Sequence, residues 1–399
     1  MPERRIVLRN CGVIDPNDIT TYLDRDGFKA LAKANSKLTG EQLVEEIKAS
    51  GLRGRGGAGF PVGLKWELTR KAQGDEKYII CNADEGEVGT FKDRFILEKD
   101  PFTLVEAIAI AGAAIGAKRG YIYLRAEYHH LLNLLRNAIT QTQDRGFLEN
   151  FSIDIHEGAG AYICGEESAL MESIEGKRGE VRYRPPFPPS SGLWGKPTVI
   201  NNVETLMNIP QIILNGAQWF NQMGTERSKG TKVFSVSGDV GKPGVYELVL
   251  GSKLKELVEG VALAKNIKIV QIGGATGRII PYGQIDTPLS FETTLGAGAV
   301  TVFDDSRDIV DIVYRTVEFL AEESCGKCVP CRQGTEVMLE TLRRFSQGKG
   351  KETDIKVLKD LASTMTLSSL CGLGQAAPNP VTDTLQYFKN AYDDRIRKN

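Results

Sequence analysis

The chain has 399 residues, of which 41% are hydrophobic and 25% are charged, and its formal net charge at pH 7 is -1. This length and composition indicate a folded globular protein of two or three domains, and the balanced charge excludes a general attraction to nucleic acid or to a membrane surface. No apolar run reaches the roughly 20 residues of a membrane-spanning helix, and the first residues lack the apolar region of a signal peptide. We therefore expect a soluble, cytoplasmic protein that reaches a membrane only through a partner.

The first part of the chain, residues 1–228, alternates between strand-like and helical patterns. The strand-like runs are Lys77–Cys81, Gly120–Leu124 and Phe151–His156, and helical runs between them include Gly40–Ala49 and Phe102–Ala117. Such alternation predicts an α/β domain with a wound sheet flanked by helices. The segment 182–189 carries four prolines, so we expect an ordered surface loop there.

Residues 229–306 have the pattern of a small mixed β domain. We expect strands at Thr231–Ser237, Val245–Leu250, Ile267–Ile272 and Ala299–Phe303, the first two forming a hairpin, and a short helix at Ser252–Val258. This order predicts a domain of the β-grasp type. Residues 307–399 are helical, with one apolar stripe at Ile309, Ile312, Val313, Val317 and Leu320 and the start of another at Val337, Leu339 and Leu342.

Four cysteines in this helical part have the spacing of metal ligands. Cys325, Cys328 and Cys331 occur in Cys-Gly-Lys-Cys-Val-Pro-Cys, and Cys371 follows in Ser-Leu-Cys-Gly-Leu-Gly. Three thiolates at such intervals suit one face of a [4Fe–4S] cluster, and a distant fourth suits the remaining iron. Structural zinc is the main alternative, although zinc sites usually have two separated Cys-x-x-Cys pairs; four unligated core cysteines is the other. The sequence favours an electron carrier with one cluster held in a helical bundle.

The densest glycine run is Gly51–Gly63, with six glycines in thirteen residues. Part of it satisfies G-x-G-x-x-G, but the preceding residues are helical, whereas a dinucleotide fingerprint follows a strand. Glycines allow backbone amides to approach an anionic ligand, and the run is accompanied by cations and one aromatic residue, namely Arg53, Arg55, Lys65 and Phe60. A nucleotide-cofactor loop is favoured over a flexible surface loop.

Three further polar segments flank predicted strands or helices. Gly158–Glu167 follows a strand, and its acids Glu166 and Glu167 suit ribose or carboxamide groups better than bare phosphate. Cys81–Glu87 also follows a strand end, where a wound sheet usually binds its ligand, and a solvated acidic turn is the alternative there. Asn201–Thr205 offers two adjacent amide side chains.

These motifs occur in the order found in one known family. Gly-Leu-Arg-Gly-Arg-Gly-Gly-Ala-Gly-Phe-Pro, Cys-Asn-Ala-Asp-Glu-Gly-Glu, Gly-Ala-Gly-Ala-Tyr-Ile-Cys-Gly-Glu-Glu, Asn-Asn-Val-Glu-Thr and Glu-Ser-Cys-Gly-Lys-Cys-Val-Pro-Cys-Arg resemble the flavin-binding, NADH-oxidising subunit of respiratory complex I. The same module serves NAD-linked hydrogenases and formate dehydrogenases. The resemblance covers nearly the whole chain and implies an FMN-binding α/β domain at 1–228, a ubiquitin-like β-grasp (SLBB) domain at 229–306, and a helical bundle with one [4Fe–4S] cluster at 307–399.

The resemblance also implies roles for individual residues. FMN contacts would come from Gly54, Arg55, Gly56, Gly57, Lys65, Asn82, Asp84, Glu85, Tyr162, Gly165, Glu166, Asn201, Asn202 and Thr205. NADH would stack between the flavin and two aromatic rings, Phe60 and Phe187, with polar contacts from the candidate catalytic residues Glu87 and Glu167. The cluster ligands would be Cys325, Cys328, Cys331 and Cys371. Two positions depart from the family pattern: Leu68 replaces a common aromatic residue, and Arg184 replaces a common lysine.

The opening residues, 6–16, resemble the NADH-binding beta subunits of multimeric [FeFe]-hydrogenases more than complex I subunits. We therefore expect an NADH-oxidising or NAD-reducing flavoprotein subunit, in which hydride passes between NADH and FMN and single electrons pass through the cluster to partners. The expected partners are a thioredoxin-like [2Fe–2S] subunit and a catalytic, hydrogenase-type subunit. The alternatives are a complex I subunit, a formate dehydrogenase partner, a flavin-bifurcating module and, from a different class, a non-enzymatic electron relay.

Overall fold

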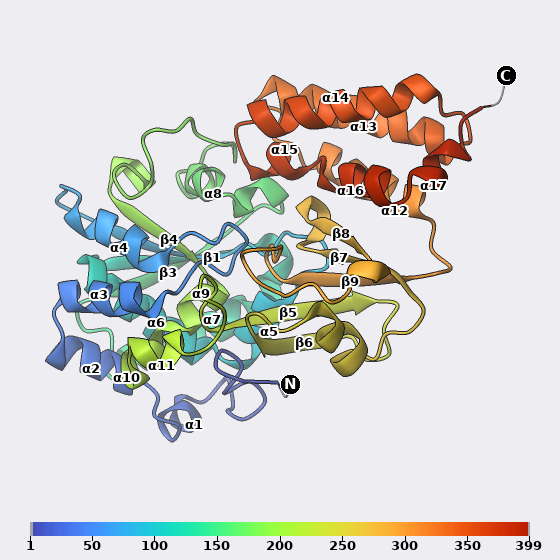
Figure 1. Ribbon diagram of the computed structural model, residues 1–399. Coiled ribbons are helices and arrows are strands. Elements are labelled where there is room, and N and C mark those ends of the chain that lie inside the picture. The colour runs from blue at the N-terminus through green and yellow to red at the C-terminus, as the bar shows by residue number, and fades with distance from the viewer. Residues whose placement is uncertain (1–2, 398–399) are drawn as a thin grey trace.

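The computed structural model describes residues 3–397, which form two β-sheets and a C-terminal helical bundle (Figure 1). The sheet formed by the N-terminal half of the chain and the second sheet lie beside each other, and the bundle, drawn in orange and red, lies against one end of the second sheet (Figure 1). The predicted division into an α/β part, a mixed sheet and a helical part is therefore present.

The first sheet has four parallel strands in the order β3-β2-β1-β4. The strands are β1 (Tyr78–Ala83), β2 (Arg119–Leu124), β3 (Ser152–Glu157) and β4 (Thr198–Asn202). Alternate side chains of β1 enter two different cores, because Ile79 and Cys81 pack on one face of the sheet and Tyr78 and Ile80 on the other. Burial on both faces explains why the central strands are runs of apolar residues.

Helix α6 (Pro101–Ile115) is almost entirely buried in the core on one face of this sheet. The Asp100 carboxylate caps its first turn by accepting a hydrogen bond from the Thr103 amide, and Gly116 ends it in the left-handed conformation that favours glycine. The other helices of this unit are α1 (Ile19–Leu23), α2 (Lys29–Lys37), α3 (Gly40–Ser50), α4 (Val62–Lys71), α5 (Lys92–Lys99), α7 (Leu132–Asp144), α8 (Glu167–Ile174), α9 (Val203–Met207), α10 (Ile209–Asn215) and α11 (Ala217–Asn221), with short 3-10 turns η1 (Ala126–Leu131), η2 (Tyr162–Gly165) and η3 (Leu193–Gly195).

The second sheet is mixed, with five strands in the order β6-β5-β9-β7-β8. The strands are β5 (Thr231–Gly238), β6 (Gly244–Val249), β7 (Ile267–Ile272), β8 (Arg278–Pro281) and β9 (Ala299–Asp304), joined by the π-helical segment η4 (Glu256–Val261) and the 3-10 turns η5 (Gly274–Thr276) and η6 (Tyr282–Gln284). β5 and β6 form the predicted antiparallel hairpin, and β5 pairs in parallel with β9.

The bundle begins with α12 (Ile309–Glu322), whose predicted apolar stripe is largely buried. The other helices are α13 (Val329–Ser346), α14 (Glu352–Ser368), α15 (Gly372–Ala376), α16 (Asn379–Tyr387) and α17 (Lys389–Asp393). In the second predicted stripe Leu339 and Leu342 are buried, but Val337 is wrong as a core residue, because its side chain is 44% exposed. The buried positions of α13 continue through Met338 instead.

Two strands and one helix differ from the sequence expectation. β4 and β8 were not predicted, since β4 is a five-residue run that ends in two asparagines and β8 is only four residues long. The helix expected at Ser252–Val258 begins later and is π-helical over Glu256–Val261.

Buried carboxylates join the three parts of the chain. Glu247 of β6 accepts hydrogen bonds from the amides of Ile6, Val7 and Leu8, which tie the N-terminal segment to the second sheet. Asp383 of α16 forms two bonds with the Arg278 guanidinium and accepts a third from the Ile279 amide, which tie the bundle to β8.

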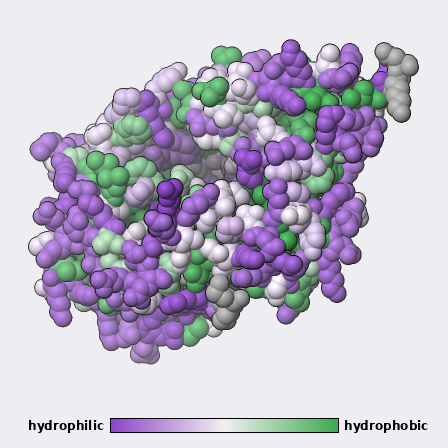
Figure 2. All heavy atoms as spheres, in the orientation of Figure 1, coloured by the Kyte–Doolittle hydropathy of each residue, from purple (hydrophilic) through white to green (hydrophobic). Residues whose placement is uncertain are grey.

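The surface in Figure 2 is largely hydrophilic, with small apolar groups scattered over it. None of the helices within residues 3–397 is both long and apolar enough to traverse a bilayer.

Candidate functional site

The glycine-rich loop lies against the carboxyl end of β4 and the start of α9. The amide of Arg55 donates a 2.8 Å hydrogen bond to Oγ1 of Thr205. A Cβ atom on Gly56 would lie 2.9 Å from Cβ of Asn202, and Gly57 has a φ of +120°. The loop can therefore approach the sheet edge only because these positions are glycines.

The two arginines of the loop hold its conformation. Arg55 is fully buried, and its guanidinium donates to the backbone carbonyls of Arg53 and Lys229 at 3.1 and 2.6 Å. Nε of Arg53 donates to the Gly59 carbonyl at 2.6 Å, and its guanidinium lies over the ring of Phe291. The sequence grouped these cations with Lys65 as anion-binding groups; in the structure both arginines face protein acceptors.

Lys65 on α4 has a different environment. Its Nζ lies 3.0 Å from Oε2 of Glu167 and donates to the Ile200 carbonyl at 3.2 Å, so it stands where α4, β4 and α8 meet. Burial raises the pKa of Glu167, but Lys65 and Arg184 outweigh burial and hold it below its usual value. Glu167 is therefore an ionised carboxylate at neutral pH.

Glu166 precedes it and has a structural partner of its own. One of its carboxylate oxygens caps α8 by accepting bonds from the Ser168 and Ala169 amides, and the other contacts Arg184. Arg184 thus bridges two adjacent acids, because it also lies 3.5 Å from Glu167.

The polar turn after β1 points in two directions. Nδ2 of Asn82, near the end of β1, donates to the Gly165 carbonyl at 2.8 Å, which brings this strand end against η2. The Asp84 carboxylate accepts no hydrogen bond from any residue within 3–397, and burial raises its pKa to about 7. A half-buried carboxyl group without a protein donor is suited to accept bonds from a ligand.

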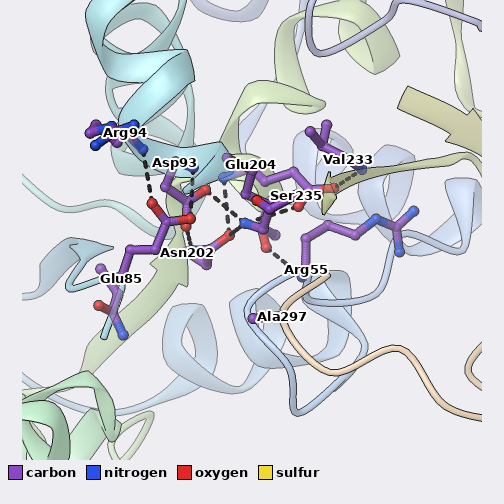
Figure 3. A network of polar contacts seen from close by, with 12 residues as sticks. Arg55, Glu85, Asp93, Arg94, Asn202, Glu204, Val233, Ser235 and Ala297 are labelled. Carbon is purple, nitrogen blue, oxygen red and sulfur yellow. Dashed lines mark hydrogen bonds and ion pairs between the residues drawn. The ribbon is translucent and has the colours of Figure 1, made fainter. Parts of the chain in front are cut away.

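Glu85 faces the other way. Its carboxylate accepts bonds from the Asp93 and Arg94 amides at 2.8 and 3.0 Å (Figure 3). It also accepts a bond from the Tyr128 hydroxyl at 2.9 Å. It therefore satisfies the first turn of α5. The sequence placed it with Asp84 as a cofactor contact, and the structure separates the two side chains.

Glu87 joins the turn after β1 to the turn between β7 and β8 of the second sheet. Its carboxylate accepts bonds from the Ala275 amide at 2.7 Å, the Thr276 hydroxyl at 3.1 Å and the Tyr162 hydroxyl at 2.9 Å. Burial raises the pKa of Glu87, although these three hydrogen bonds act to lower it. The two candidate catalytic acids, Glu87 and Glu167, thus lie on separate hydrogen-bond networks.

The adjacent residues Asn201 and Asn202 also contact different parts of the protein. Oδ1 of Asn201 accepts a 2.8 Å bond from the indole of Trp66, while Nδ2 of Asn202 donates to Asp93 at 2.7 Å and its Oδ1 caps α9. The aromatic residues Phe60 and Phe187 are 44% and 53% exposed, so both rings are accessible to a ligand.

The sequence missed several buried residues that support this region. One is aromatic, Trp66, and four carry charge: Lys92, Asp93, Glu204 and Lys232. Only Glu204 lay within a recognised motif, Asn-Asn-Val-Glu-Thr. The adjacent charges of Lys92 and Asp93 gave no signal, because such a pair on a helix is usually solvated.

All four predicted cluster ligands line one pocket. Its lining consists of Ile163, Val181, Ser324, Cys325, Lys327, Cys328, Cys331, Leu370, Cys371 and Leu373. Cys328 is the N-cap residue of α13 and Cys371 that of α15, and neither cap has a side-chain hydrogen bond. The N-termini of two helices therefore adjoin the pocket, and the positive ends of their dipoles suit an anionic cluster.

The set of donors suits an iron–sulfur cluster. Four thiols line the same largely apolar pocket, and in a cubane each of four thiolates binds its own iron. The four cysteines therefore fit a [4Fe–4S] cluster.

One short turn contacts both regions. Within η2, the Gly165 carbonyl bonds to Asn82 beside the glycine-rich loop, while Ile163 lines the cysteine pocket. The Tyr162 amide donates to Glu323, and its ring packs edge-on against Phe319 of α12. The short turn η2 therefore contacts both the end of β1, beside the glycine-rich loop, and the cysteine pocket.

Fold and site together define a flavoprotein oxidoreductase subunit with an iron–sulfur cluster. Residues 47–211 match the Nuo51 FMN-binding domain, and residues 311–395 match the NADH-ubiquinone oxidoreductase-F iron-sulfur binding region. The chain belongs to the family of NADH-oxidising, FMN- and [4Fe–4S]-carrying subunits of complex I and of NAD-linked hydrogenases.

Relatives from both kinds of enzyme are similar over most of the chain. An NADH-quinone oxidoreductase subunit of Rhizobium meliloti (strain 1021) is 44% identical, covering 98% of each chain. NADP-reducing hydrogenase subunit HndC of Solidesulfovibrio fructosivorans is also 44% identical, covering 98% of this chain and 83% of that protein. The crystal structure of an NAD+-reducing [NiFe]-hydrogenase in the H2-reduced state gives a TM-score of 0.90 at 41% identity, covering 96% of this chain and 67% of that chain.

These similarities confirm the main functional predictions. The chain is an NADH:acceptor oxidoreductase subunit, and its cofactors are FMN, NAD(H) and a [4Fe–4S] cluster. It is a subunit of a multi-subunit hydrogenase or of complex I.

Proposed function

We propose that this chain is the NAD(H)-handling subunit of a soluble, cytoplasmic, NAD-dependent [FeFe]-hydrogenase. The observation that carries this proposal is the 44% identity to a hydrogenase subunit across 98% of the chain. The likeness of residues 6–16 to hydrogenase beta subunits supports it further. The partners would be a thioredoxin-like [2Fe–2S] subunit and the catalytic hydrogenase subunit.

The division of the chain forms part of the proposal. We assign residues 1–228 to FMN and NADH binding, 229–306 to a β-grasp domain of the SLBB type, and 307–399 to the cluster-bearing bundle. The strand order β6-β5-β9-β7-β8 supports a β-grasp domain, because it places the first and last strands in parallel at the centre of a mixed sheet.

In the proposed flavin site each loop has a separate task. When bound, FMN exchanges a hydride with the nicotinamide and single electrons with the cluster. The amides of Gly56 and Gly57 and the ammonium of Lys65 would face the anionic parts of FMN, while Arg55 acts from behind by fixing the loop. The remaining flavin contacts would come from Asn82, Asp84, Tyr162, Gly165, Glu166, Asn201, Asn202 and Thr205, with Glu85 supporting them through α5.

The nucleotide would lie on the open side of these loops. Phe60 and Phe187 offer exposed rings for stacking. Glu167, held ionised by Lys65 and Arg184, is suited to accept hydrogen bonds from the nucleotide. Glu87 is bonded to three protein donors, so its part is to fix the loop beside the nucleotide.

The test is anaerobic purification of the chain with its bound partners, followed by visible and EPR spectra before and after NADH is added. We expect the flavin absorbance to bleach and a reduced-cluster signal to appear. Mass spectrometry of the co-purified subunits, together with an assay of NADH-dependent H2 production, then tests the hydrogenase assignment. A flavin that ignores NADH in the complete complex, or FMN that does not bind, would contradict the proposed activity.

A complex I-type enzyme is the second candidate. The Rhizobium meliloti relative is equally identical and matches this chain over 98% of both sequences. Co-purification with other NADH-quinone oxidoreductase subunits, and NADH-dependent quinone reduction in place of H2 production, would favour it.

A further inference from the structure

A network of buried charges lies directly behind the glycine-rich loop (Figure 3). Nζ of Lys92 lies 2.7 Å from Asp93 and 3.0 Å from Glu204, and Nζ of Lys232 lies 2.5 Å from the same Glu204 oxygen. The side chains of Lys92, Glu204 and Lys232 are fully buried. Three of these residues come from α5 and α9 of the first domain, but Lys232 belongs to β5 of the second sheet.

Lys232 holds a turn that supports the loop. Besides Glu204, its ammonium donates to the carbonyl of Ala297 at 2.9 Å. A Cβ on Gly57 would lie 3.7 Å from the Ala297 amide, so this turn packs directly against the loop. The ammonium of Lys232 therefore fixes one wall of the loop.

The other wall is fixed through Glu204. Its amide bonds to Oδ1 of Asn202, which caps α9, and Nδ2 of Asn202 donates to Asp93. Gly56 packs on Asn202 so closely that no Cβ could be accommodated. Glu204 also accepts a bond from the Val233 amide at 2.8 Å, which fastens α9 to β5.

Stability alone is a weak reason for such an arrangement. Removing two charges from water is costly, and well-packed apolar residues are often at least as stabilising as a buried ion pair. What a buried, fully bonded ammonium supplies is a fixed position for each of its acceptors. Here the acceptors belong to both walls of the glycine-rich loop.

We propose that Lys232 is a positioning residue for FMN, supplied by the second sheet, which holds the glycine-rich loop and Asn202 in their binding arrangement through Glu204 and Ala297. This inference rests on the proposed function, in which that loop binds FMN. It gives the β-grasp domain a direct part in the flavin site, although none of its strands was assigned a flavin contact.

The test measures the FMN dissociation constant by flavin fluorescence quenching, on the full chain with its cluster intact and its flavin removed. Lys232→Met keeps the length of the side chain and removes its charge and donors. We expect FMN to bind at least tenfold more weakly and the visible circular dichroism of bound FMN to change, with the iron content unchanged. Lys253→Met is the matched control, since Lys253 lies in the same domain in an exposed pair with Asp286.

A second variant separates positioning from charge balance. Lys232→Met with Glu204→Gln removes both members of the pair, so no uncompensated carboxylate remains, and it also carries the test if Lys232→Met does not fold. We expect its thermal midpoint to recover toward wild type while FMN still binds at least tenfold more weakly, because the bond to Ala297 is not restored.

Two results would overturn the inference: wild-type FMN affinity in Lys232→Met, or full recovery of FMN affinity in the double variant. Failure of the wild-type chain to bind FMN is distinguishable from both, since it would overturn the proposed flavin site together with this inference.

Discussion

Nζ of Lys65 and Oε2 of Glu167 lie 3.0 Å apart, joining residues that are about one hundred positions distant in the sequence. This pair joins α4 to α8, and Nζ of Lys65 also lies 5.9 Å from the centre of the Phe60 ring. Because Arg184 also contacts Glu167, the carboxylate is balanced by two cations before any ligand arrives.

Replacing Glu167 by glutamine tests its proposed contact with the nucleotide. Hydrogen bonds to a charged group contribute about 1.5–3 kcal/mol, so we expect Glu167→Gln to weaken NADH binding by roughly tenfold or more, with a smaller effect on turnover at saturating NADH. Equilibrium titration with NADH and steady-state kinetics with an artificial acceptor measure the two effects. Glu149→Gln, at an exposed glutamate, is the control; an unchanged dissociation constant and turnover would remove Glu167 from the site.

Replacing Cys371 by serine tests the ligand set. The serine oxygen is a poor ligand for a cluster held by thiolates, so we expect iron to fall well below the roughly four atoms per chain of a [4Fe–4S] cluster, while FMN binding persists. Iron analysis and low-temperature EPR of the reduced chain check this. Cys11→Ala is the matched control, because Cys11 is buried outside the pocket, and equal iron loss in both variants would contradict the assignment.

Leu68 offers a gain-of-affinity test. This residue replaces a common aromatic in the family, and its side chain is 48% exposed on α4 near Lys65. Stacking of a base on an aromatic ring contributes about 1–3 kcal/mol, so we expect Leu68→Phe to strengthen NADH binding at least several-fold. Leu263→Phe, at an exposed leucine between η4 and β7, should have no effect. If Leu68→Phe also leaves NADH affinity unchanged, the adenine does not reach this part of α4.

Glu247 makes the N-terminal segment sensitive to pH. Burial raises the pKa of Glu247 to about 7, although the four hydrogen bonds that its carboxylate accepts act to lower it. Since the folded-state pKa lies above the unfolded value, its contribution to stability is fully present below about pH 4.5 and is lost as the pH rises through about 7.

We therefore expect amide protection of Ile6, Val7 and Leu8, corrected for intrinsic exchange rates, to fall between pH 5 and about pH 7 and then to level off. Hydrogen exchange measured by mass spectrometry on the N-terminal peptide is the readout. Glu247→Gln removes the titrating group, so its protection should be independent of pH over this interval. A parallel fall in the variant would assign the effect to another group.

Much of the fold could be predicted because its strands and helices have strong local patterns. β1, β2 and β7 are apolar runs bounded by turn residues, and α6 carries both its cap and its terminal glycine. β4 escaped prediction because two of its five residues are asparagines, which are depleted in strands. Its place beside β1 is decided by packing and not by local preference.

The motifs of the site could be predicted from the sequence, but the directions in which their side chains point could not. Adjacent residues at a strand end point to opposite sides, so Asp84 and Glu85 received one role from the sequence and have different surroundings in the structure. The arginines of the glycine-rich loop show the same limitation, since charge pattern does not reveal that Arg55 is enclosed. The supporting lysine, Lys232, lies in the second sheet and could be found only from the tertiary contacts.

The carboxylates that fasten one part of the chain to another limit how the molecule can be recombined. Glu87 and Glu204 accept hydrogen bonds from the amides of Ala275 and Val233, which lie in the part of the chain that forms the second sheet. Glu247 of β6 accepts hydrogen bonds from amides of the N-terminal segment, and Asp383 of α16 accepts hydrogen bonds from the Arg278 guanidinium. A chimaera built by exchanging one domain with that of a relative would leave a carboxylate buried without its donors wherever the junction residues differ. Design of hybrid reductases on this scaffold should therefore transfer each acid together with the segment that it anchors.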